Sequence, residues 1–197
     1  MILLVILYHQ SGTHQKTEAN LASMMPAMAR PAKTAKLPDG VVRMMGSRQV
    51  YSGPQLNADE LTSFLASYQI DHVIDLAHEA KAETNLSDAT ERFIVEKTGA
   101  TYWPLNIEGA GSQLNSKVLS TIDSLLDSDE PVFVHCLHGI HRVGVAKGRA
   151  YARDGRNWPE IIALLRWEKV IDTIYDRYTY NVRSAVVKYQ ISLNRSK

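Results

Sequence analysis

Short apolar runs alternate with amphipathic segments over most of the chain, and this alternation restricts the possible folds more than any other feature. The expected strands cover residues 41–46, 49–53, 72–77, 100–107 and 131–136. Apolar residues at helical spacing lie between them, and the expected helices cover residues 58–69, 87–99, 116–128, 143–154, 158–168 and 173–188. Strands that alternate with helices predict one α/β domain, with a central, mostly parallel sheet flanked by helices on both faces.

The predicted helices carry recognisable end signals. Asn57, Ser87 and Asn157 stand where a side-chain oxygen would accept a hydrogen bond from the first turn, and Gly99 stands where the second helix should end. The acidic and basic pairs in residues 163–177 are interpreted as a solvated helix face.

Composition limits the possible functions. The chain has 197 residues, enough to bury a full core without disulfides or metal ions. Its 22 basic and 21 acidic residues argue against general electrostatic binding to nucleic acid or membranes, so any anion site must be local. A single cysteine excludes an intramolecular disulfide and leaves one thiol to be explained.

Residues 1–38 read as an N-terminal tail, flexible or targeting, and residues 39–197 as the folded domain. The apolar run at the start is too short to span a bilayer as a helix, and it lacks the positive charges of a secretory signal. No stable membrane span is therefore expected. We expect a cytoplasmic location, or a periplasmic or secreted one if the apolar segment acts as a signal.

The stretch HCLHGIHR, residues 135–142, contains the only cysteine and follows a continuous apolar strand. Ligands of open α/β sheets bind at this carboxyl edge of the strands. Backbone N–H groups of the loop, together with the positive end of the next helix, would form an anion cradle. The expected phosphate-binding residues are Leu137, His138, Gly139, Ile140, His141 and Arg142.

The same cationic surroundings favour the thiolate of Cys136, which is a nucleophile at neutral pH. Two simpler interpretations stay open. Cys136 could be a buried structural residue, or it could bind zinc together with His135, His138 and His141, although four ligands within seven residues are not the usual spacing. His135 is interpreted as a hydrogen-bonding residue that shapes the loop.

His135-Cys136-x5-Arg142, with Gly139 in the middle, resembles the signature loop of the cysteine-dependent protein tyrosine and dual-specificity phosphatases. The segment 50–55 and the run VIDLA are similar to the compact members of that family, and His141 resembles its atypical plant and fungal branch. The resemblance implies a phosphatase that forms a cysteinyl-phosphate and needs no metal or other cofactor. The expected substrates are phosphorylated proteins, on tyrosine, serine or threonine, inositol phosphates, or other small phosphoesters.

Two positions depart from the family pattern. Val143 follows the arginine, where the family has Ser or Thr to assist the departing thiolate. No aspartate follows Trp103-Pro104, and the first acid is Glu108, on a glycine-rich loop. The predicted catalytic residues are therefore Cys136, Arg142 and, as general acid, Glu108, which could equally be a solvated loop residue. These departures keep open a pseudophosphatase that binds phosphorylated ligands with little turnover. A sulfurtransferase with a cysteine loop is a third alternative.

Overall fold

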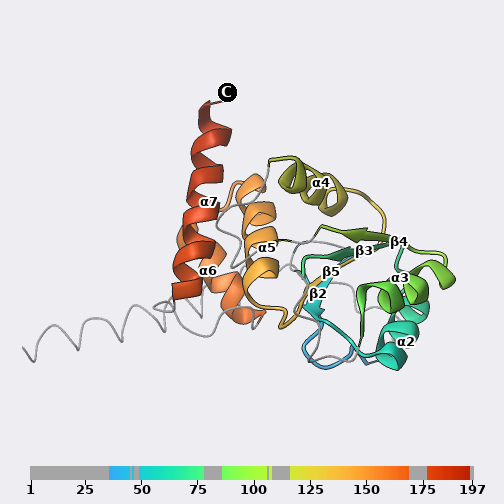
Figure 1. The fold of residues 1–197 in the computed structure, drawn as a ribbon. Coiled ribbons are helices and arrows are strands. Elements are labelled where there is room, and N and C mark those ends of the chain that lie inside the picture. Colours follow the sequence, from blue (N-terminus) through green and yellow to red (C-terminus); the bar gives the residue numbers. More distant parts are fainter. Residues whose placement is uncertain are drawn as a thin grey trace, which may run out of the picture. The chain divides into compact units, whose positions relative to one another are not determined.

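The computed structural model describes residues 36–44, 46, 49–77, 86–105, 107, 116–168 and 177–195 (Figure 1). Residues 1–35, most of the predicted tail, lie outside these ranges, so the proposed domain boundary at residue 38 stays a prediction. None of the helices in the described part of the chain is both long and apolar enough to cross a membrane.

A five-stranded sheet in the order β1-β2-β5-β3-β4 forms the centre of the fold. Its strands are β1 (Val42–Arg43), β2 (Val50–Pro54), β3 (His72–Asp75), β4 (Thr101–Pro104) and β5 (Val132–Cys136). β1 runs antiparallel to β2, and the other three pairings are parallel. The predicted α/β fold with a mostly parallel sheet is confirmed, although β1 and β4 are shorter than predicted.

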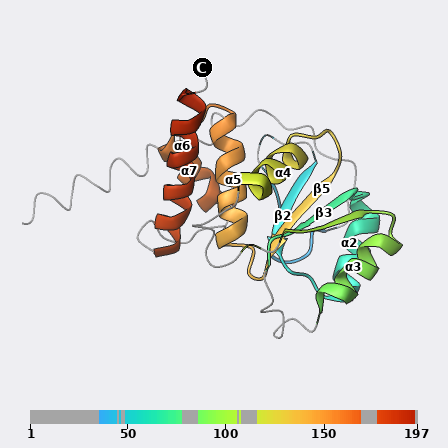
Figure 2. The same ribbon diagram turned by 45° about the horizontal axis from the view of Figure 1, so that its top comes forward.

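Helices cover both faces of this sheet (Figures 1 and 2). On one face lie α2 (Ala58–Tyr68) and α3 (Asp88–Lys97). The other face carries α4 (Ser116–Leu126), α5 (His141–Arg153), α6 (Trp158–Trp167) and α7 (Arg177–Arg195). Compared with the sequence prediction, α5 begins two residues earlier and α7 extends seven residues further, to Arg195, while the predicted start of the last helix at residue 173 lies outside the described residues.

The predicted end signals operate as expected. Asn57 and Asn157 each accept a hydrogen bond from the N–H of a glutamate three residues later, and that glutamate bonds back to the asparagine N–H. These capping boxes satisfy backbone donors that the helix itself leaves unpaired. Ser87 caps α3 in the same way through one hydrogen bond, and Gly99 follows the last turn with a φ of 88°.

The alternation of side chains along β5 divides the interior into two cores. Val132, Val134 and Cys136 pack on the side of α4 to α7. Phe133 packs against α2 and α3, and the next side chain on that side, His135, stacks on its ring. Neighbouring residues of one strand therefore face different environments, as the two-residue period of a strand requires.

Helix α5 is buried along most of its length, because α4, α6, α7 and the sheet all pack on it. Its Lys147 is fully buried, donates a hydrogen bond to Ser52 at 2.9 Å and pairs with Glu168 at 2.5 Å. Glu168 also accepts a hydrogen bond from Tyr151. The acidic and basic residues of 163–177 were predicted to form a solvated helix face. This prediction is wrong for Glu168, which is buried directly after the last residue of α6.

Candidate active site

Cys136 is the last residue of β5, the strand in the middle of the sheet. β5 pairs in parallel with β2 on one side and with β3 on the other, and Cys136 lies opposite Pro54. All five residues of β5 are buried, and the cysteine side chain is 4% exposed. The single thiol therefore lies at the carboxyl edge of the parallel strands, where this class of sheet binds ligands.

The loop after Cys136 is held against the end of β2. The N–H of Gln55 donates a hydrogen bond to the carbonyl oxygen of Leu137 at 3.3 Å. Gly139 is buried and has a φ of 69°, a conformation that residues with a side chain rarely adopt. A Cβ atom at this position would lie 2.5 Å from the backbone carbon of Gly53 and 2.5 Å from the nitrogen of Pro54. Only glycine lets the loop lie so close to β2.

The loop leads directly into α5, whose first residues are His141 and Arg142. Within the described residues, no side chain caps the first turn of α5, whereas α2, α3 and α6 each have a side-chain cap. Unpaired N–H groups and the positive end of the helix dipole attract anions. Arg142 is half-buried in this turn, and its guanidinium group has the shape to bind two phosphate oxygens at once.

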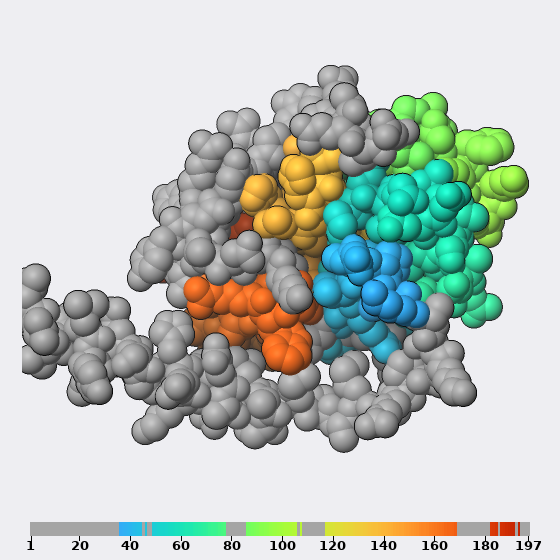
Figure 3. Space-filling view, turned by 90° about the horizontal axis from the view of Figure 1, so that it is seen from below, coloured from blue at the N-terminus to red at the C-terminus, as the bar shows by residue number. Residues whose placement is uncertain are grey.

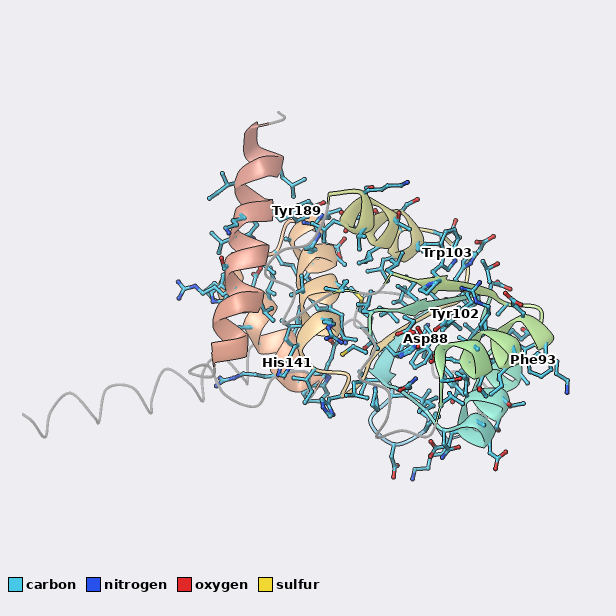
Figure 4. The ribbon with its side chains drawn as sticks, in the orientation of Figure 1. Asp88, Phe93, Tyr102, Trp103, His141 and Tyr189 are labelled. Carbon is cyan, nitrogen blue, oxygen red and sulfur yellow. The ribbon has the colours of Figure 1, made fainter. Side chains whose placement is uncertain are left out.

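The loop reaches the molecular surface. His138 is exposed, and Ile140 and His141 are half-buried. Figure 3 shows the amber segment around residue 140 among the atoms visible on this face of the molecule, and Figure 4 shows His141 at the start of α5. Positively charged or ionisable side chains at positions 138, 141 and 142 thus lie on or directly beside one short loop.

His135 lies behind this loop, on the opposite face of β5 from Cys136. It is fully buried, and its Nε2 atom is 2.7 Å from Oε1 of Glu91 on α3. This position agrees with the interpretation of His135 as a residue that supports the loop. It also separates His135 from the solvent-exposed His138, so the two do not converge with Cys136 on one metal ion, and the zinc alternative loses its support.

Sequence reasoning missed three side chains around His135. Asp75, Glu91 and Tyr102 are all buried, from β3, α3 and β4 respectively. A usable signal was present for Glu91, which lies four residues before the buried Val95 and therefore on the inner face of α3. Burial, followed by the nearby charge of Asp75, raises the pKa of Tyr102, so this residue is a neutral hydrogen-bond donor.

Glu108, the predicted general acid, lies outside the described residues. The chain that leads to it does start from the carboxyl edge of the sheet. β4 ends at Pro104, and the N–H of Leu105 donates a hydrogen bond to the carbonyl oxygen of Asp75 at 2.9 Å. Since Asp75 and Cys136 end neighbouring parallel strands, Leu105 lies at the same edge of the sheet as the cysteine loop.

No protein-family model matches the sequence, and no curated protein sequence matches it. The fold, however, matches solved structures. TpbA of P. aeruginosa superposes with a TM-score of 0.60 at 19% identity, over 84% of this chain and 99% of that chain. The core catalytic domain of the PP-IP phosphatase SIW14 of S. cerevisiae gives a TM-score of 0.59 at 13% identity, over 77% of this chain and 86% of that chain. This chain therefore has the fold that TpbA and the PP-IP phosphatase SIW14 share.

Proposed function

We propose that the chain is a phosphatase that hydrolyses phosphomonoesters through a cysteinyl-phosphate. The observation that carries this proposal is the placement of one thiol and one arginine on either end of a glycine-containing loop, between a buried parallel strand and an uncapped helix. The match of the fold to TpbA and SIW14 adds support, although the function itself must reside in the site rather than in the fold.

In the first step, the thiolate of Cys136 attacks phosphorus in line with the departing oxygen. A sulfur–phosphorus bond forms, the phosphorus–oxygen bond breaks, and Glu108 donates a proton to the leaving group. Loop N–H groups and Arg142 stabilise the charge on the three equatorial oxygens throughout. In the second step, water attacks phosphorus, Cys136 departs as a thiolate, and inorganic phosphate is released.

An aryl phosphate assay tests this mechanism. Cys136→Ser should abolish turnover and still bind ligand, because the loop and Arg142 remain. Arg142→Lys should lose both turnover and binding, since a point charge does not replace the two-pronged contact. Lys36→Met, which changes a side chain that is 89% exposed, is the matched control for a lost positive charge. Turnover by Cys136→Ser comparable to that of the wild type would refute the covalent step.

A binding module of the pseudophosphatase type is the second candidate, and Val143 favours it. This residue of α5 is fully buried in the core, and its side chain offers no hydroxyl group to the departing thiolate. A protein of this kind would hold phosphorylated ligands in the same loop with little turnover. Equal affinity of wild type and Cys136→Ser for a phosphopeptide, with no hydrolysis by either, would select this alternative.

For the substrate we propose either a phosphorylated protein or an inositol phosphate. TpbA has been crystallised in complex with pTyr, and SIW14 is described as a PP-IP phosphatase, so the shared fold accommodates both kinds of ligand. Comparison of kcat/KM for phosphotyrosine, phosphoserine and phosphothreonine peptides with that for inositol phosphates would decide between them. Exclusive turnover of aryl esters that carry a single phosphate group would remove the inositol option.

A further inference from the structure

A cluster of buried polar side chains lies behind the cysteine loop, and we call it the His135 cluster. Its members come from three strands, one helix and the residue that follows β2, and they are at most 8% exposed: Gln55, Asp75, Glu91, Tyr102 and His135. They close the core between the sheet and α2–α3 at the edge where the loop begins. Figure 4 shows Tyr102 and the neighbouring Asp88 in the region where β4 meets α3. The proposed chemistry uses none of these side chains directly.

Each carboxylate oxygen of the cluster faces a hydrogen-bond donor. Oε2 of Glu91 accepts from the side-chain amide of Gln55 at 2.7 Å, and its Oε1 lies 2.7 Å from Nε2 of His135. Asp75 accepts from the hydroxyl of Tyr102 at 2.5 Å and from the N–H of Ala77 at 2.8 Å. The contact of His135 with Glu91 is thus an ion pair when the imidazole carries its second proton.

The same atoms also have the composition of a cation site, because ligand atoms of Asp75, Glu91 and His135 lie within 4.8 Å of one another. The carboxylate oxygens that a metal ion would need, however, already face partners of the protein: three hydrogen-bond donors and the imidazole of His135. The cluster can therefore act on the site through the residues that it holds in place.

The cluster holds the chain on both sides of the thiol. Before Cys136, the imidazole of His135 is bound to Glu91 and stacks on Phe133, with ring centroids 5.2 Å apart. After Cys136, the carbonyl of Leu137 is bound by the backbone N–H of Gln55, whose side chain is bound to the same Glu91. One buried carboxylate on α3 thus fixes both neighbours of the nucleophile.

We propose that Glu91 is a positioning residue, which acts through His135 and Gln55 to set the geometry and reactivity of Cys136. Its negative charge also balances a proton on His135, and a protonated imidazole one residue from the thiol favours the thiolate. This inference rests on the proposed function only for its effect on turnover, because the reactivity of the thiol can be measured without a substrate.

The single cysteine makes the test specific, since alkylation by iodoacetamide at neutral pH reports on Cys136 alone. Glu91→Gln should slow alkylation, and kcat for an aryl phosphate, by about tenfold or more, the loss expected when a hydrogen bond to a charged group is removed. Its KM should change little, because Glu91 does not line the loop. Glu96→Gln, an exposed position on the same helix, is the control and should match the wild type.

A matched pair of tyrosines separates positioning from stability. Tyr102→Phe removes a bond to Asp75 inside the cluster, whereas Tyr151→Phe removes a bond to buried Glu168 on the other face of the sheet. Both should lower the midpoint of urea unfolding, but only Tyr102→Phe should slow alkylation. If Glu91→Gln does not fold, this pair still tests whether the His135 cluster controls the reactivity of Cys136.

Three results would overturn the proposal: a folded Glu91→Gln that alkylates at the wild-type rate, equal slowing by the two tyrosine variants, or a wild-type rate that changes when a chelator is added. The last result would assign the cluster to a bound cation. If the wild type hydrolyses no phosphoester, the proposed function fails, and the alkylation rates still test the role of Glu91.

Discussion

At the scale of single residues, Gly139 is a position where the surrounding backbone leaves no room for a side chain. Its positive φ and its contact with the backbone of Gly53 and Pro54 are independent reasons to exclude a side chain. A flexible side chain could move away from an added methyl group, but the backbone of β2 is fixed by its hydrogen bonds to β5. The loop cannot admit a Cβ atom without leaving the strand.

Gly139→Ala should therefore abolish turnover, and it should lower the free energy of unfolding by more than the cost of about 1–2 kcal/mol for the left-handed conformation alone. Gly155→Ala is the matched control, because Gly155 has a φ of 81° and its Cβ atom would meet nothing within 4 Å. Gly155→Ala should lower the free energy of unfolding only by the cost of the left-handed conformation, and it should retain activity. Urea unfolding and an aryl phosphate assay measure the two effects, and equal activity of the two variants would contradict our account.

From Val143 we predict that the second chemical step limits turnover. Without a hydroxyl to donate a hydrogen bond to the departing thiolate, loss of the cysteine should cost about 1.5–3 kcal/mol, or roughly ten- to a hundredfold in rate. The quenched wild type should contain phosphocysteine and show a burst of first product. Val143→Thr keeps the shape of the buried side chain, and it should raise steady-state turnover and shrink the burst.

Val145→Thr, also buried in α5, controls for the cost of a hydroxyl in this core. If the wild type shows neither a burst nor a trapped intermediate, and Val143→Thr turns over at the same rate, another group assists the thiolate and this role of Val143 is wrong.

At the scale of elements, α5 connects the site to the rest of the fold, and its contact with α7 depends on Gly148. A Cβ atom at position 148 would lie 2.6 Å from Cγ2 of Val186. The sequence predicted both helices, but not that they approach this closely, because a glycine within a helix has no periodic signal.

Gly148→Ala should destabilise the protein by about 1–3 kcal/mol, the usual range for overpacking, although alanine is the better helix former. Val186→Ala removes the opposing methyl groups, so the double variant should be more stable than the sum of the two single changes predicts. Urea unfolding of all four proteins measures this coupling. Strict additivity would show that α5 and α7 move apart without strain.

Other elements show what the sequence can and cannot reveal. Asn57, Asn157 and the apolar run of β5 carry local signals, so strands, helices and the position of the cysteine loop could be predicted. Contacts between distant segments leave no local signal. Burial of Glu168 depends on Lys147, twenty-one residues earlier, and the other members of the His135 cluster come from four separate segments. The cluster behind the site could be found only from the structure.

At the scale of the whole molecule, the strand order places β5 between β2 and β3, although β5 is the last of the five strands in the sequence. Pairings between segments so far apart in sequence slow folding, because a long chain must be closed before the contacts form. We therefore expect the sheet and the cysteine loop to form in the same step of folding.

Pulse alkylation during refolding tests this expectation. Cys136 should become protected from iodoacetamide only in the slowest major phase, because its burial requires pairing on both sides of β5. Helical circular dichroism should recover earlier, since helices need only local contacts. Protection of the thiol within the dead time of mixing would show that β5 docks before the remainder of the sheet.

The late position of β5 has a further consequence for the newly made chain on the ribosome. Roughly 80 residues separate the end of β2 from the start of β5, which takes about 4–16 s at ordinary rates of synthesis. During this interval β2 and β3 have no partner between them, and unpaired strand edges are sites of aggregation. A nascent chain of this protein therefore has a vulnerable period of seconds, which ends only when the strand that carries its single thiol emerges.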